Sequence, residues 1–178
     1  MTEFSRRTFV TSVMGALGAV GVAAAVPTSA LATETRAGAP YDAFLRATGV
    51  VGDSTDANYR DWIYVDSWSW GTLGKGVDPL TLTTQPGRHS ATLLGKAFTS
   101  SVIDEIALVV RKVGFQNFDI ITLTLKSAVV AQAMSEAGSR TTVETWSIPS
   151  YSKAELRMRS INSRGQLGAW ETAIWQAN

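Results

Sequence analysis

Polar and apolar residues alternate along most of the chain after residue 40, with the two-residue period of a half-buried β-strand. The alternation is regular in Glu105–Arg111 and Ile120–Lys126, which the turn at 113–117 separates. Short strands divided by turn residues are typical of an antiparallel sandwich or barrel. The other segments with this pattern are Tyr41–Leu45, Asp61–Trp70, Val129–Met134, Thr142–Ile148, Lys153–Ile161 and Ala169–Trp175.

One stretch, roughly Gly87–Phe98, lacks the alternation, and the spacing of its His89, Thr92, Leu93 and Lys96 fits a short helix on the flank of the barrel. The sequence therefore predicts a mainly β fold: an antiparallel β-barrel of two packed sheets with one short α-helix. We expect a single domain over residues 41–178, preceded by a flexible leader over residues 33–40.

The segment before the leader has the features of an export signal. Arg6 and Arg7, followed by Phe9 and an aliphatic residue, resemble the twin-arginine motif. An uncharged apolar stretch rich in Ala and Gly follows and ends where Ala30 and Ala32 form a small-x-small pattern. We predict a signal peptide over residues 1–32, cleaved after Ala32, with cleavage after Ala30 as the alternative, and hence a protein secreted by the twin-arginine pathway.

A membrane anchor is the competing interpretation of this stretch, but its length is marginal for a spanning helix and three glycines weaken it. We therefore expect no membrane association once the signal is removed. Cleavage removes two of the 16 basic residues and one of the 15 acidic residues, and leaves the mature chain without net charge. That balance favours self-association and gives no support for a nucleic-acid partner.

The chain has no cysteine and one histidine, which excludes disulfide frameworks, thiol nucleophiles and multi-histidine metal sites. The Gly71–Gly76 segment lacks the spacing of a phosphate-binding loop. Ser90, next to His89 in a helix, would point away from it, and His89 is expected on the surface or the helix flank. We predict no catalytic residue, no cofactor and no metal. Paired carboxylates for a hydrolase could come only from residues that nothing ties together: Asp53, Asp56, Asp61, Asp66, Asp104 and Glu105.

Six tryptophans are more than a small core needs, and three interpretations stay open for them. They fill the interior, they form a flat platform for sugar rings, or they are buried between subunits. The second interpretation makes the protein a secreted carbohydrate-binding module that uses Trp62, Trp68 and Trp70, which the alternation places on one strand face with Tyr64.

The order of segments resembles the Hcp family (haemolysin-coregulated protein), the inner-tube protein of type VI secretion systems. The resemblance rests on Tyr41-Asp42-Ala43-Phe44-Leu45 at the first strand, Ser67-Trp68-Ser69-Trp70-Gly71 at the next, and a late hairpin with Gly165-Gln166-Leu167-Gly168 at its tip. It implies a non-catalytic protein that forms rings of six copies, which stack into a tube that accommodates secreted cargo. It also implies that a loop at about Gly71–Pro79 contacts the next ring, with Thr72, Leu73, Lys75 and Val77 as candidates.

The Lys153–Ile161 strand has the two faces that a ring contact requires. Ala154, Leu156 and Met158 can point inward, while Glu155 and its basic neighbours can reach carboxylates of another subunit or face solvent. Ring contacts depend on aromatic and arginine anchors, for which we nominate Arg157, Trp170 and Trp175.

Overall fold

The computed structural model describes residues 41–73, 76–77, 79–114, 116–137 and 142–176. The export motif and its cleavage site, with Arg6, Arg7, Phe9, Ala30 and Ala32, lie outside the described residues. The strands are β1 (Tyr41–Ala47), β2 (Ile63–Val65), β3 (Ser67–Ser69), β4 (Thr72–Leu73), β5 (Gly76–Val77), β6 (Leu80–Thr84), β7 (Val102–Lys112), β8 (Phe118–Val129), β9 (Gln132–Ala137), β10 (Thr142–Ile148), β11 (Lys153–Ile161) and β12 (Leu167–Gln176), with one helix in this part of the chain, α1 (Ser90–Phe98).

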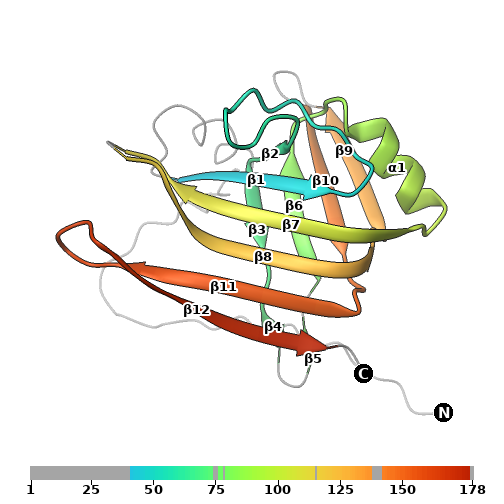
Figure 1. Cartoon of the computed structure of the whole chain (residues 1–178). Helices are drawn as coiled ribbons and strands as arrows, with labels where there is room; N and C mark the ends of the chain where they lie inside the picture. Colours follow the sequence, from blue (N-terminus) through green and yellow to red (C-terminus); the bar gives the residue numbers. More distant parts are fainter. Residues whose placement is uncertain (1–40, 74–75, 78, 115, 138–141, 177–178) are drawn as a thin grey trace, which may run out of the picture.

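The strands form two main antiparallel sheets, which confirms the predicted mainly β fold. One sheet has six strands in the order β12-β11-β8-β7-β1-β2, and the other has four in the order β3-β6-β10-β9. The strands of the larger sheet run across those of the smaller one (Figure 1). β4 and β5 pair only with each other, as a small hairpin.

The core lies between the two sheets because the two-residue period turns every second side chain toward the opposite sheet. Leu45, Leu108 and Leu123 are direct cross-strand partners on β1, β7 and β8, and each is at most 2 % exposed. Leu82 and Trp146, paired on β6 and β10, belong to the same core cluster.

The prediction of one continuous strand over Asp61–Trp70 is wrong. The chain changes sheets at Asp66: β2 pairs with β1 in the larger sheet, and β3 pairs with β6 in the smaller one. Trp62 and Trp68 therefore do not share a face. Trp62 packs in a separate cluster with Phe44, whereas Trp68 packs against the main core.

The predicted helix is present as α1, at one end of the sheets (Figure 1). Leu93 is its buried residue, and Thr99 caps its C-terminus through backbone hydrogen bonds. His89 stands at the N-cap of the helix. Of its two expected locations, the surface and the helix flank, the surface is wrong, because His89 is 3 % exposed. In the part of the chain that the structure describes, no helix has the length and apolarity to span a bilayer.

Candidate assembly surface

The β11–β12 hairpin forms one edge of the six-stranded sheet. β12 is ten residues long and pairs only with β11. All residues of β12 are exposed except Trp170 and Trp175, which are half-buried. Ile174 is 54 % exposed. The backbone groups on its outer edge find no partner among the described residues, so β12 offers a long unpaired template for another strand.

A stacked cluster of cations and an aromatic ring stiffens the hairpin. The Arg159 and Arg157 guanidinium carbons lie 4.5 and 5.1 Å from the centre of the Trp170 ring. Arg159 Nε also donates a hydrogen bond of 2.5 Å to the carbonyl oxygen of Asp119, which ties the hairpin to β8. Two predicted anchors, Arg157 and Trp170, are thus in contact, and Arg157 remains exposed.

The third predicted anchor, Trp175, lies at the other end of β12 and packs toward the core. Its ring meets Trp70 edge-to-face at 5.3 Å, and Trp70 Nε1 donates a hydrogen bond of 3.3 Å to the Tyr151 hydroxyl. Trp70 lies two residues before the β4–β5 hairpin. This aromatic group therefore joins the root of that hairpin to the end of the edge strand.

The β4–β5 hairpin contains three of the four residues nominated for contacts between rings. Thr72 and Leu73 form β4 and Val77 belongs to β5, with Thr72 paired to Val77. Lys75 lies outside the described residues. The hairpin leaves the smaller sheet near the end of β12 (Figure 1).

The opposite part of the larger sheet holds a cluster that the sequence analysis missed. The Arg111 side chain is 7 % exposed and contacts Asp42 at 2.9 Å and Asp56 at 2.8 Å. Its guanidinium carbon lies 4.8 Å from the centre of the Phe44 ring and 5.5 Å from that of Tyr59. The cluster holds the 52–62 loop on the outer face of the sheet. Alternation gave no sign of it, since Asp56 and Tyr59 lie in a loop.

The charges of this cluster are mutually stabilised. The hydrogen bond from Arg111 lowers the pKa of Asp56, while burial and the hydrogen bond to Asp119, at 2.5 Å, raise the pKa of Tyr59 above its usual range. Burial opposes the charge of Arg111, but its bonds to Asp56 and Asp42 more than offset that effect and raise its pKa. Tyr59 stays protonated and Asp56 ionised at neutral pH, which describes a structural ion cluster.

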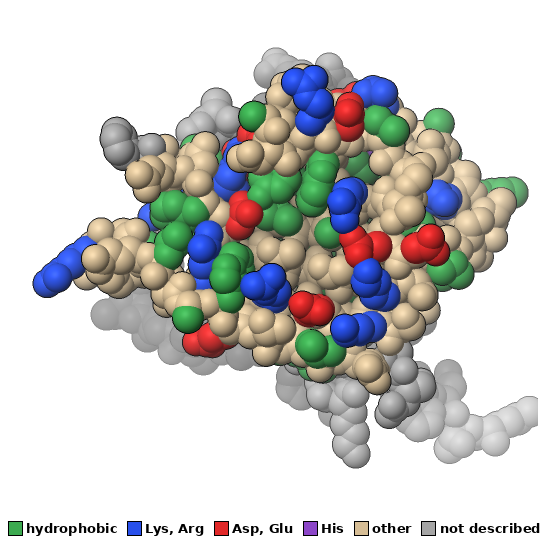
Figure 2. Space-filling view, viewed as in Figure 1, with side chains coloured by type: hydrophobic (Ala, Val, Ile, Leu, Met, Phe, Trp, Pro, Cys, Tyr) green, Lys and Arg blue, Asp and Glu red, His purple; other side chains and the backbone are tan. Residues whose placement is uncertain are grey.

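The outer face of the sheet continues as a mosaic of charges. Glu105 contacts Arg46 at 2.5 Å and also Lys126, and these hydrogen bonds, that of Lys126 first, lower the pKa of Glu105. Figure 2 shows basic and acidic side chains interspersed over this face, with apolar ones between them. Such a face has no single-sign field that would attract a polyanion.

His89 belongs to a buried network at the start of α1. The Thr84 hydroxyl lies 3.2 Å from His89 Nε2 and accepts a 2.9 Å hydrogen bond from Trp146 Nε1. Glu144 Oε2 lies 3.7 Å from Nε2, and Asp53 Oδ2 lies 4.0 Å from Nδ1. Burial lowers the pKa of His89 despite both carboxylates. The neutral imidazole thus packs the helix start against β6 and β10.

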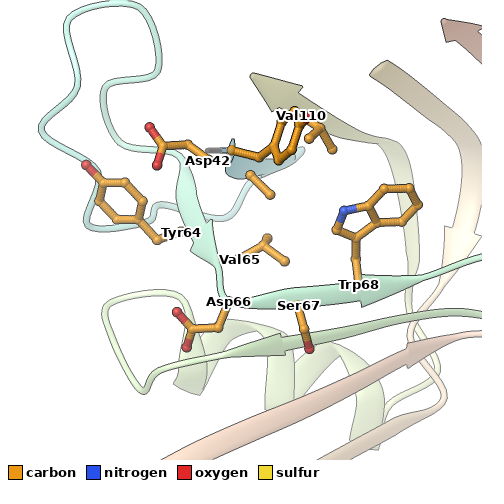
Figure 3. Close-up of a pocket in the computed structure, with 9 residues that line it drawn as sticks. Asp42, Tyr64, Val65, Asp66, Ser67, Trp68 and Val110 are labelled. Atoms are coloured by element: carbon orange, nitrogen blue, oxygen red, sulfur yellow. The ribbon is translucent and has the colours of Figure 1, made fainter. Parts of the chain in front are cut away.

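A hollow lies between the sheets at the end where β1 begins. It has a volume of about 280 Å³, and its walls include Tyr41, Ala43, Val65, Trp68 and Val110; we call these five residues the apolar slot. Figure 3 shows Trp68 and Val65 on two sides of the slot, while Asp42 and Tyr64 point away from it. No carboxylate pair converges in its interior.

The tryptophans lie at several separate places in the fold. Within the described ranges, no group of three or more His, Asp or Glu side chains is placed to hold a metal ion. The tryptophans form no platform: Trp146 is 2 % exposed, Trp70 and Trp175 pack on each other, and Trp170 is covered by arginines. The carbohydrate-binding interpretation is therefore not favoured.

Comparison with known proteins identifies close structural relatives. The family model described as type VI secretion system effector, Hcp, matches residues 44–157, which is more than half of the chain. Hcp1 from Salmonella typhimurium is 25 % identical with a TM-score of 0.67, over 77 % of this chain and 94 % of that one. A type VI secretion system effector from Yersinia pestis is 19 % identical with a TM-score of 0.66, over 76 % and 100 % of the two chains. No curated protein sequence matches.

Proposed function

The chain belongs to the Hcp family of type VI secretion effectors, and on that premise we propose that its mature form works without catalysis, by assembling with copies of itself into a closed ring. We expect a hexamer, as the family resemblance implies, with a lumen that can accommodate secreted cargo. The uncovered outer edge of β12 is the observation that carries the proposal.

The edge strand supports a ring for a physical reason. Natural sheets shorten, charge or cover their edges, because an exposed ladder pairs with whatever strand meets it. A ten-residue edge with apolar Ile174 on it calls for a cover, and a second copy of the chain supplies one. When the partner surface differs from β12, the contact is heterologous, and such contacts form a ring when the rotation from one copy to the next closes.

Arg157 and Trp170 would provide anchors beside that edge, and Trp175 would hold its far end against Trp70. We place the β4–β5 hairpin, with Thr72, Leu73, Lys75 and Val77, at a contact between successive rings. We also propose that the signal over residues 1–32 directs the folded chain out by the twin-arginine pathway and that the mature protein begins at residue 33.

Native mass spectrometry of residues 33–178 tests the central proposal. We expect one closed oligomer, of six copies, and a strictly monomeric protein at micromolar concentration would contradict it. Thr172→Pro and Ala173→Pro sharpen the test, because successive N–H groups of a strand point to opposite sides. One variant should disrupt β11–β12 and unfold more easily. The other should keep the monomer intact and lose the oligomer.

Export is tested separately. Replacing Arg6 and Arg7 together by lysine keeps the charge and removes the guanidinium pair, so the precursor should accumulate in the cytoplasm. N-terminal sequencing of the exported wild-type protein should begin at Thr33, or at Leu31 for the alternative cleavage. Equal export of the lysine variant would contradict the proposed route without affecting the ring.

A further inference from the structure

Helix α1 carries an apolar side chain that the fold does not use. Phe98, its last residue, is 92 % exposed, and Leu94, one turn earlier on the same face, is 55 % exposed. Burial of a phenylalanine side chain stabilises a protein, and the folded chain gains almost none of this stabilisation from Phe98. We call Phe98 and Leu94 the knob.

The apolar slot is the matching concave feature. Tyr41 forms part of its wall and is 45 % exposed, whereas Val65 and Val110 are 7 % and 6 % exposed. An apolar cavity of about 150 Å³ already admits benzene, so the slot, at about 280 Å³, has room for a benzyl group. Tyr41 and Trp68 offer aromatic walls for edge or offset contacts with it.

The knob and the slot of one molecule cannot meet. β7 begins four residues after Phe98 and has Val110, a wall of the slot, near its other end. The eight steps from Val102 to Val110 span roughly 27 Å at about 3.3–3.4 Å per residue. Figure 1 shows α1 and the start of β1 at opposite ends of the larger sheet. Only a second molecule can bring a knob to the slot.

Charge adds little to this match. Lys96 lies two residues before Phe98 in the last turn of the helix. Asp42 and Asp66 are among the residues that line the slot, and Asp42 is already paired with Arg111 at 2.9 Å. The contact therefore depends on the apolar fit of Phe98 to the slot.

We propose that Phe98 of one copy inserts into the apolar slot of a second copy. The contact joins two different surfaces, so it is heterologous and directional, and it repeats from copy to copy. It deepens the proposed self-assembly and rests on it, but it uses residues at the ends of the strands and none from β12.

Cysteine crosslinking tests the contact directly, because the natural chain has no cysteine. A mature protein with both Phe98→Cys and Tyr41→Cys should give a ladder of covalent oligomers under mild oxidation. Either single variant should give dimers at most. The matched control combines Phe98→Cys with Ile174→Cys, another exposed apolar position, and should crosslink at least roughly tenfold less.

Truncation of the knob gives the second readout. Phe98→Ala should leave the circular dichroism spectrum unchanged and raise the protein concentration needed for assembly roughly tenfold, as expected for loss of an aromatic anchor. Val51→Ala, which shortens a side chain that is 44 % exposed, should not change it.

The outcomes separate this inference from the proposed function. Excess crosslinking of the Phe98–Tyr41 pair supports the contact. Intact rings in native mass spectrometry without that excess overturn it and leave the ring in place, as would happen if the knob served a different protein. Monomers under every condition overturn both.

Discussion

The two edges of the six-stranded sheet are built in opposite ways. At one edge, β2 has three residues, and the 52–54 segment covers the residues before it through hydrogen bonds from Gly52 N to Asp61 O at 2.7 Å and from Ser54 N to Trp62 O at 2.9 Å. At the other edge, β12 has ten residues and no described segment beyond it. The chain covers the residues beside the first edge with its own backbone, and no described segment pairs with the second. In the proposed assembly, a second copy covers that second edge.

The largest expected effect on stability comes from replacing Arg111, whose ion pairs hold the 52–62 loop on the sheet. Arg111→Met leaves Asp42 and Asp56 without their partner and removes the stack on Phe44 and Tyr59. Since breaking a buried ion cluster on one side costs about 3–5 kcal/mol, urea unfolding should show a loss of that size. Arg46→Met, which removes an exposed ion pair, should cost at most about 1 kcal/mol. Equal losses would mean that the cluster does not hold this end.

A smaller loss of stability is expected when a single methyl group is added at Gly52, in the 52–54 segment that covers the first edge. A Cβ at Gly52 would lie 2.2 Å from the carbonyl oxygen of Trp62, so Gly52→Ala must push the 52–54 segment away. We expect about 1–3 kcal/mol of destabilisation in urea unfolding. Gly95→Ala is the control: a Cβ there meets nothing within 4 Å, and the helix should gain about 0.5–1 kcal/mol. A gain for both variants would show that the segment is not closely packed.

The pH dependence of stability tests the 52–54 segment through His89, whose Nδ1 lies 4.0 Å from Asp53 Oδ2. Burial lowers the pKa of His89 from its ordinary 6.5, so below pH 6.5 the unfolded chain binds the proton more readily than the folded one. The free energy of unfolding should therefore fall as the pH drops from about 6.5, by no more than about 1.4 kcal/mol per unit. His89→Gln should lose this slope between pH 6.5 and 5, above the range of Asp56 and Glu105. An unchanged slope would assign it to other groups.

Alternation predicted the strands well because each strand buries one face. Glu105–Arg111 and Ile120–Lys126 lie within β7 and β8, and Thr142–Ile148 and Lys153–Ile161 agree with β10 and β11. The prediction of a strand over Val129–Met134 is wrong, since β8 continues to Val129 and β9 begins at Gln132. Ends of this kind depend on partner strands, which the local pattern does not contain.

The site was less accessible to such reasoning. The alternation of polar and apolar residues continues through both β2 and β3, so the local sequence does not show that the chain changes sheets at Asp66. His89 is buried beside Thr84, which also accepts the hydrogen bond from Trp146. Arg111 forms its ion pairs with Asp42 and Asp56. Apart from Thr84 and His89, these partners are far apart in the sequence, and only the fold brings them together. The sequence also does not show that Phe98 is exposed, because an apolar residue in a helix is usually expected in the core.

The smallest effect on the monomer, and the sharpest comparison of the two edges, comes from Ile174→Lys. Ile174 is 54 % exposed and faces Glu155 across the ladder, so a lysine there should change the free energy of unfolding by less than about 0.5 kcal/mol. An edge lysine is the usual device that blocks strand pairing, so the oligomer in native mass spectrometry should dissociate. Thr124→Lys places the same charge on the same row of the sheet, two strands inward, and should leave the oligomer intact. If both variants dissociate it, the copies meet through the face of the sheet, and the asymmetry of its edges has another cause.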